Sequence, residues 1–233
     1  GPFSLVTTIT NYNTLTYSHT TANAQAASVY YYLTTKTACG GESSLPSDTL
    51  QTMKLDVINN NGVAVVTWNP LHNPELATAT TTYDVYREYP AGAWNLIGTT
   101  NAPVYQWFDT INVCQAVINY RVQTGDNAGC SSSSSIDGDL FRDITKPTVA
   151  LIDTVSLDPL APSQISLSWL PSVSGDVVGY VLYHFNGASW DSVGAVSGIT
   201  SSFFQFTDPS AALAPQLYSI SAYDSCGNIS NIG

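Results

Sequence analysis

Apolar residues recur with a period near two along most of the chain, in short runs. Residues 63–68 (VAVVTW) and residues 164–169 (QISLSW) are two such runs, and in each the final tryptophan is followed closely by a proline. Alternation of this kind places the apolar side chains on one face of a β-strand. We therefore predict a half-buried strand at both places, with Trp68 and Trp169 packed in the cores.

The residues that follow each tryptophan also recur, at a distance of about one hundred positions. The matched pairs are Tyr83 with Tyr180, Tyr86 with Tyr183, Trp94 with Trp190, and Tyr120 with Tyr218. Turn formers such as the Asn-Asn-Gly at residues 60–62 separate the alternating runs. A repeat of this length made of short strands predicts a β-sandwich copied in series. We name the two copies the Trp68 repeat and the Trp169 repeat.

The first fifty residues alternate as well, but no tryptophan opens them. They predict strands at residues 4–10, 14–20 and 28–37 and a short return strand near residues 46–52. Aligned with the two repeats, this stretch matches only their second halves. We therefore expect half of a sandwich here, with an apolar face and open strand edges that favour self-association.

These motifs resemble fibronectin type III domains. The resemblance rests on Trp68 and Trp169 with their following prolines, on Tyr-x-x-Tyr in the third strand, and on Tyr120-Arg121-Val122 and its copy at residues 218–220. The Cys…Trp…Cys spacing of antibody domains is missing from the sequence. The resemblance implies an all-β chain of tandem immunoglobulin-like (fibronectin type III) β-sandwiches. The expected boundaries are 1–50 for the carboxyl-terminal half of a first domain, then 51–143 and 144–233 for two whole domains.

The net negative charge of the chain excludes some classes of binding partner. Charged residues make up 10% of the chain, and six Lys and Arg face seventeen Asp and Glu, for a net charge of −11. This field repels phosphates and anionic lipids, so we expect no nucleic acid partner. Since no apolar run is long enough to cross a bilayer, we expect no membrane insertion either. The expected partners are a protein or glycan at the cell surface, or neighbouring repeats of the same protein.

A narrower resemblance is to surface proteins of gliding Bacteroidetes that are exported by the type IX system. It rests on Asp-Ser-Cys-Gly-Asn-Ile-Ser at residues 224–230, and on a looser version at residues 39–43. It implies an extracellular, cell-surface location and O-glycosylation of Ser or Thr between Asp and an apolar residue. The residues that fit that pattern are Thr49, Thr110, Thr154 and Ser192.

Residues that could carry chemistry are few. We expect His19, His72 and His184 to be isolated surface residues, since no acid lies at a spacing that would pair with them. No nucleophile elbow and no pair of neighbouring carboxylates suggests catalysis, so we expect neither an enzyme nor a bound cofactor. Asp137, Asp139 and Asp143 could supply oxygen ligands to Ca²⁺, although solvated turns are often rich in aspartate.

The four cysteines, Cys39, Cys114, Cys130 and Cys226, fit no zinc pattern. Cys114 and Cys130 flank the sixth strand of the Trp68 repeat, whose length of roughly 26 Å keeps them too far apart to bond. In a head-to-tail tandem, the loop that holds Cys114 faces the turn that holds Cys226. We therefore predict a Cys114–Cys226 disulfide that locks the two repeats, with Cys39 left for a partner elsewhere. The alternative is that all four thiols are reduced or unpaired.

The function that fits these expectations is a non-catalytic segment of a surface protein, serving as spacer, display or adhesion repeats. One alternative is an ancillary module of a secreted enzyme that degrades polysaccharides. Another is a ligand-binding receptor ectodomain. Since one fold serves many functions, the preference rests on analogy.

Overall fold

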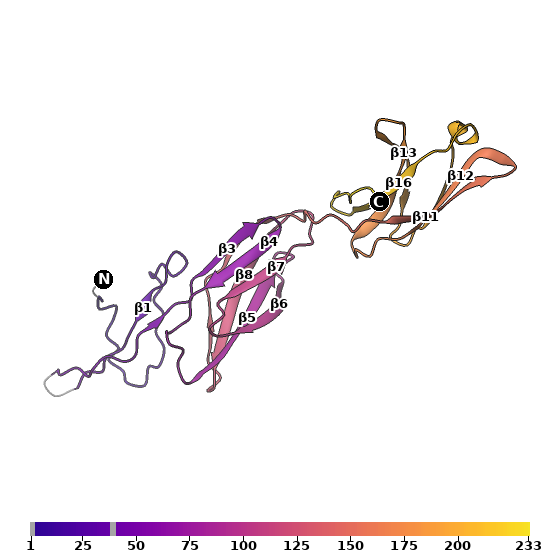
Figure 1. Ribbon diagram of the computed structural model, residues 1–233. Coiled ribbons are helices and arrows are strands. Elements are labelled where there is room, and N and C mark those ends of the chain that lie inside the picture. The colour runs from indigo at the N-terminus through magenta and orange to yellow at the C-terminus, as the bar shows by residue number, and fades with distance from the viewer. Residues whose placement is uncertain (1–2, 38–40) are drawn as a thin grey trace. The chain divides into compact units, whose positions relative to one another are not determined.

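The computed structural model describes residues 3–37 and 41–233, and over these residues it is all-β (Figure 1). The chain forms two compact units. The first contains Gly1–Thr110 and Val117–Leu140, and the second contains Ile111–Ala116 and Phe141–Gly233. In the described part of the chain, no helix is long and apolar enough to cross a membrane.

The stretch before the Trp68 repeat contains far less strand than its pattern predicts. Its strands are β1 (Tyr30–Tyr31) and β2 (Leu50–Gln51), which pair antiparallel, and residues 4–20 form none. The expectation of strands at 4–10, 14–20 and throughout 28–37 is therefore wrong. An extended segment becomes a strand only when a neighbour completes its hydrogen bonds. Residues 4–20 form no bridge with another described segment, and residues 33–37 pair with residues 42–47 only through scattered hydrogen bonds and one isolated bridge, between Lys36 and Ser43. Self-association through this segment stays a prediction.

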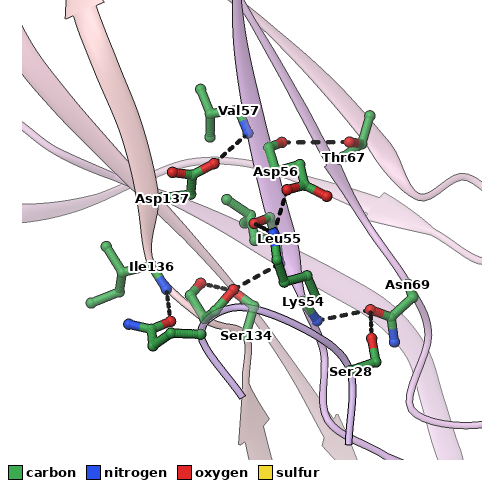
Figure 2. A network of polar contacts seen from close by, with 12 residues as sticks. Ser28, Lys54, Leu55, Asp56, Val57, Thr67, Asn69, Ser134, Ile136 and Asp137 are labelled. Atoms are coloured by element: carbon green, nitrogen blue, oxygen red, sulfur yellow. Dashed lines mark hydrogen bonds and ion pairs between the residues drawn. The ribbon is translucent and has the colours of Figure 1, made fainter. Parts of the chain in front are cut away.

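Residues 25–29 are nevertheless fixed to the start of the Trp68 repeat. Ser28 Oγ donates to Oδ1 of Asn69 at 2.9 Å (Figure 2). The backbone of Val29 exchanges two hydrogen bonds with Thr52. Gln25 Oε1 also accepts from the N–H of Ile136 at 3.2 Å. The segment is thus held by polar contacts rather than by a shared core.

The Trp68 repeat folds as a two-layered sandwich. One sheet has the order β3-β4-β7, and the other has the order β10-β8-β5-β6 with β9 added to β8. The strands are β3 (Leu55–Asn60), β4 (Val63–Trp68), β5 (Ala79–Glu88), β6 (Trp94–Asn101), β7 (Gln106–Thr110), β8 (Ala116–Asp126), β9 (Ser131–Ser133) and β10 (Asp137–Phe141). We call it the Trp68 sandwich. This division of strands into two sheets is that of the predicted fibronectin type III architecture.

The core of the Trp68 sandwich is aromatic. Trp68 is 6% exposed, Tyr83 is 1% exposed, and their ring centres lie 5.8 Å apart. The predicted burial of Trp68 is therefore confirmed. At the edge, Trp107 packs on Gly98, where a Cβ atom would collide with the indole ring. That contact explains why β6 carries a glycine there.

The Trp169 repeat folds in the same way, as the Trp169 sandwich. Its sheets have the orders β11-β12-β15 and β14-β13-β16. The elements are β11 (Leu151–Asp158), β12 (Ala161–Leu170), β13 (Val177–Phe185), β14 (Trp190–Ser197), β15 (Phe203–Thr207), the 3₁₀ turn η1 (Pro209–Ala212) and β16 (Tyr218–Asp224). The fold class is thus tandem β-sandwiches, as predicted.

The core of the Trp169 sandwich repeats that of its neighbour at matching positions. Trp169 is 2% exposed, so its predicted burial is confirmed, and its ring centre lies 5.4 Å from that of the fully buried Tyr180. Phe204 packs on Gly194 as Trp107 packs on Gly98. The internal repeat seen in the sequence therefore extends to side-chain packing.

Candidate functional site

The turn after β16 is organised around Asp224. Its Oδ1 accepts hydrogen bonds from the backbone N–H groups of Cys226 and Asn228, each at 2.8 Å, and its Oδ2 accepts one from the Asn228 side chain at 2.8 Å. An aspartate commonly closes a turn in this manner. Asp224 is only 2% exposed, so its carboxylate is both fixed and withdrawn from water.

Two further carboxylates lie beside Asp224. Asp143 comes from the segment before β11, and Asp176 directly precedes β13. Each of the three residues offers one oxygen, and these oxygens lie within 4.8 Å of one another. We call Asp143, Asp176 and Asp224 the carboxylate cluster. All three belong to the carboxyl-terminal unit, so the cluster is internal to it.

A disulfide lies next to the carboxylate cluster. Cys114 and Cys226 are bonded, with their Cα atoms 4.6 Å apart, and this is the predicted pair. The segment Ile111–Ala116 clusters with Phe141–Gly233, so the bond lies inside the carboxyl-terminal unit rather than locking two units together. The N–H of Asp143 donates to the carbonyl of Val113 at 2.7 Å and holds the same segment.

The other two cysteines, Cys130 and Cys39, are not part of this disulfide. Cys130 is exposed and forms no disulfide with a described residue, and Cys39 lies outside the described residues. β8 spans Ala116–Asp126 between Cys114 and Cys130, which is the separation expected to keep those two cysteines apart.

The grouping of Asp137, Asp139 and Asp143 expected from sequence is wrong, because the structure does not bring the three together. Asp137 and Asp139 lie in β10, where their carboxylates accept backbone hydrogen bonds instead. The Asp137 carboxylate accepts from the N–H of Val57 on β3 at 2.9 Å, as Figure 2 shows. Of these three predicted residues, only Asp143 belongs to the carboxylate cluster.

A second polar cluster surrounds Asp208, which is 9% exposed. Tyr218 donates its hydroxyl proton to Oδ2 at 2.6 Å, and both the N–H and the hydroxyl of Ser210 donate to Oδ1. His184 Nε2 lies 3.8 Å from Oδ2 and 2.8 Å from Oε1 of Gln216. The expectation that His184 is an isolated surface residue is therefore wrong, because folding brings β13 and the end of β15 together.

Electrostatics favour the charged form of Asp208. Burial acts to raise the pKa of its carboxyl group, but the hydrogen bonds from Ser210 and Tyr218 and the charge of His184 outweigh it and lower that pKa. Conversely, burial and the bond to Asp208 raise the pKa of the Tyr218 hydroxyl. In a nucleophilic triad the serine hydroxyl donates to the histidine. Here the Ser210 hydroxyl donates to Asp208, so the cluster does not have the hydrogen bonds of a triad.

The same arrangement recurs in the Trp68 sandwich. There Asp109 accepts a hydrogen bond from the hydroxyl of Tyr120 at 2.8 Å and an ion pair from Arg87 at 3.1 Å. An arginine cannot act as a general base at neutral pH, so an arrangement shared by both sandwiches points to support of the fold. We assign the Asp208 cluster the same structural role.

The candidate glycosylation residues differ in accessibility. Thr110, Thr154 and Ser192 are exposed, at the end of β7 and within β11 and β14. Thr49 is half-buried just before β2. Trp190, the repeat partner of Trp94, is 37% exposed and packs on Phe185 with ring centres 5.2 Å apart.

Sequence analysis missed Asp176 and Asp224 as partners of Asp143. They are far apart along the chain, and only the docking of three separate segments brings them together. The structure matches Asp176 with Thr78 of the Trp68 repeat, because each residue directly precedes the position that pairs with the turn aspartate. An acid that appears in one copy alone marks a feature that the fold does not require.

No protein-family model matches the chain. No curated protein matches it either. Among solved structures, it resembles the FN1-FN3 domains of chicken CNTN1, with 18% identity, a TM-score of 0.33, and coverage of 88% of this chain and 75% of that one. It also resembles fibronectin(III)-like modules of Clostridium thermocellum CbhA, with 13% identity, a TM-score of 0.31, and coverage of 78% and 90%. Neither likeness bears on what this chain binds.

Proposed function

We propose that this chain is a non-catalytic segment of an extracellular protein, in which its sandwiches serve as spacer or display repeats at the cell surface. The observation that carries the proposal is the Cys114–Cys226 disulfide. Disulfides form and persist in oxidising compartments and are rare in reducing cytosol. A disulfide that holds a loop to a sandwich therefore supports export.

The surface chemistry supports the same location. Only 10% of the residues are charged, and polar uncharged residues such as Thr, Ser and Asn take their place. The net charge of −11 keeps such a chain away from anionic lipids and nucleic acids. A surface of this kind suits a segment that separates or presents other parts of a protein.

A non-catalytic role is supported by the arrangement around Asp208. The most catalytic-looking group of side chains, His184 with Asp208 and Ser210, has a counterpart built on Arg87 in the other sandwich. Both sandwiches use this tyrosine–aspartate contact to join their two sheets, so a structural role is enough to explain it.

A finer proposal is that the protein belongs to the glycosylated surface proteins exported by the type IX system of Bacteroidetes. The exposure of Thr110, Thr154 and Ser192 supports it, because an attached glycan needs a hydroxyl that reaches solvent. The half-buried Thr49 fits less well and should carry less glycan.

The test uses the protein as its source cells make it. Antibodies against the chain are applied to intact cells, and the recovered protein is alkylated and mapped without reduction. We expect labelling of intact cells and a peptide pair that joins Cys114 to Cys226. Labelling that appears only after lysis, or two freely alkylated thiols at these positions, would overturn the proposal.

A further inference from the structure

We propose that the carboxylate cluster of Asp143, Asp176 and Asp224 is a Ca²⁺ site. The three residues come from three separate segments of the carboxyl-terminal unit, and their oxygens lie within 4.8 Å of one another. Two oxygens bound to one Ca²⁺ at 2.3–2.6 Å are separated by at most about 5 Å. The cluster therefore has the dimensions of one coordination shell.

The surroundings of the Asp143 side chain support a cation site independently. Its side chain is only 1% exposed, and its Oδ1 accepts a single hydrogen bond, from the N–H of Thr145 at 2.8 Å. Its Oδ2 has no hydrogen bond or ion pair with any described residue. A carboxylate on a side chain buried to this degree keeps little water, and one hydrogen bond compensates its charge poorly. A cation in the cluster supplies that partner.

The charge of the cluster leads to the same conclusion. Asp143 and Asp224 are almost completely buried, and none of the three carboxylates forms an ion pair with a lysine, arginine or histidine in the described part of the chain. Like charges this close repel one another strongly where water is scarce. A divalent cation turns that repulsion into attraction.

The donors select Ca²⁺ among the common metals. All three are carboxylate oxygens, and the nearby Cys226 sulfur is committed to a disulfide. Zinc and copper prefer nitrogen and sulfur, whereas Ca²⁺ takes six to eight oxygens and accepts irregular geometry. Mg²⁺ demands a tighter octahedron. Asp176 is partly exposed, so water can complete the shell on its side.

The Trp68 sandwich shows the same turn without the cluster. There Oδ1 of Asp126 accepts from the N–H groups of Ala128 and Cys130 at 2.9 and 2.8 Å, as Asp224 does in the Trp169 sandwich. Asn127 N–H donates to the carbonyl of Thr78, just as Ser225 N–H donates to that of Asp176. Thr78 thus stands in the place of Asp176. The turn needs its own aspartate, but it does not need the additional acids.

A bound ion would tie together the three segments that supply its ligands. Asp143 is also linked to the turn by the Asn228 side chain, which donates to the Asp143 carbonyl at 3.3 Å. The disulfide joins the same turn to the segment Ile111–Ala116. We therefore expect Ca²⁺ to stabilise the carboxyl-terminal unit and to leave the unfolding of the Trp68 sandwich unchanged.

The experiment uses the full chain, stripped of metal with a chelator. Calorimetric titration with CaCl₂ and thermal unfolding in 10 mM CaCl₂ or chelator are applied to the wild type, to Asp176→Asn and to Asp153→Asn. Asp153 is an exposed carboxylate of the same unit outside the cluster, so it is the matched control. We expect a Kd of about 10⁻⁴–10⁻³ M, typical of extracellular Ca²⁺ modules. The corresponding rise in Tm of the carboxyl-terminal unit is about 5 °C or more.

The variants separate a metal site from a purely structural cluster. Asp176→Asn should abolish the response to Ca²⁺, yet in chelator it should melt at or above the wild-type Tm because one repelling charge is gone. Asp153→Asn should respond as the wild type does. Absence of binding, an unchanged response in Asp176→Asn, or a variant that is less stable in both conditions would overturn the proposal. An equal response to MgCl₂ would overturn the assignment to Ca²⁺.

Discussion

Each sandwich places a basic side chain beside an aspartate that accepts a tyrosine hydroxyl, but the basic residue differs between the two. In both, a buried or half-buried aspartate at the end of a strand accepts the hydroxyl of a tyrosine from the adjoining sheet. The sets are Arg87, Asp109 and Tyr120 in the Trp68 sandwich and His184, Asp208 and Tyr218 in the Trp169 sandwich. The arginine pair lies at 3.1 Å, and the histidine pair lies at 3.8 Å.

The difference shows which part of the motif is essential. The tyrosine-to-aspartate hydrogen bond is kept at 2.8 and 2.6 Å in the two copies, whereas the cation and its distance vary. A guanidinium stays charged at all working pH values, while an imidazole can lose its charge. In the Trp169 sandwich, the hydroxyl and N–H of Ser210 take over part of the compensation.

The largest effect should come from what the sandwiches share most closely, their core tryptophans. Trp68→Ala and Trp169→Ala should each lower the free energy of unfolding of their own sandwich by about 3–5 kcal/mol. Urea unfolding followed by hydrogen exchange of individual peptides reads each sandwich separately. Trp190→Ala, at a site 37% exposed, is the control. A near-neutral Trp169→Ala would contradict the correspondence of the two cores.

The disulfide is the clearest feature without a counterpart, since Ala128 stands in the Trp68 repeat where Cys226 stands in the Trp169 repeat. Cys226→Ser should lower the free energy of unfolding of the carboxyl-terminal unit by roughly 2–5 kcal/mol. Cys130→Ser is the matched control, because that thiol is exposed and has no disulfide partner among the described residues. Equal stability of Cys226→Ser and the wild type under oxidising conditions would contradict the expectation.

The two cations should differ in their contributions. Arg87→Met removes a charged hydrogen bond to Asp109, whose side chain is 14% exposed, and should cost about 1–3 kcal/mol. His184→Met loses a longer contact and should cost about 1 kcal/mol or less. Thermal unfolding of both variants measures the difference, with Arg142→Met as an exposed control. A larger loss for His184→Met would reverse the comparison.

The smallest effect concerns acid. The pKa of Asp208 is lowered in the folded state, so its contribution to stability is present above the usual aspartate pKa of about 3.9 and is lost as the pH falls through the lowered value. Asp208→Asn should therefore be less stable than the wild type at neutral pH, and the gap should narrow in acid. Unfolding followed between pH 2 and 6, with Asp153→Asn as the control, measures it. A gap that widens in acid would show the opposite sign.

Much of this architecture follows from the sequence, because alternation reports directly on which strand face is buried. Trp68, Trp169 and the tyrosines that follow them carry that signal twice, and the second copy corroborates the first. The pairing of Cys114 with Cys226 was also predicted, from a head-to-tail order of the two repeats. For the first fifty residues, alternation predicted strands that the structure mostly lacks. Their alternation is real, but a strand also needs a neighbour, which periodicity does not report.

The polar clusters were harder to predict for a different reason. His184 and Asp208 lie on segments that only β-sheet formation brings together, and Asp143 reaches Asp176 and Asp224 only after the whole unit has closed. Comparison of the repeats position by position would have pointed to His184, which aligns with Arg87. The match of Asp176 with Thr78 is visible only in the structure, through their hydrogen bonds to the turn.

The disulfide also decides how the chain carries a mechanical load. Tension applied along the backbone passes from Cys114 to Cys226 through the sulfur atoms, across a sequence separation of 112 residues. Strands β8 to β16 lie within that covalent loop and bear none of the pull. After reduction, complete unfolding of these strands would let the loop extend to roughly 400 Å, at about 3.5 Å per residue. The oxidation state of a single bond therefore sets how far this chain can be drawn out, and which strands are the first to be strained.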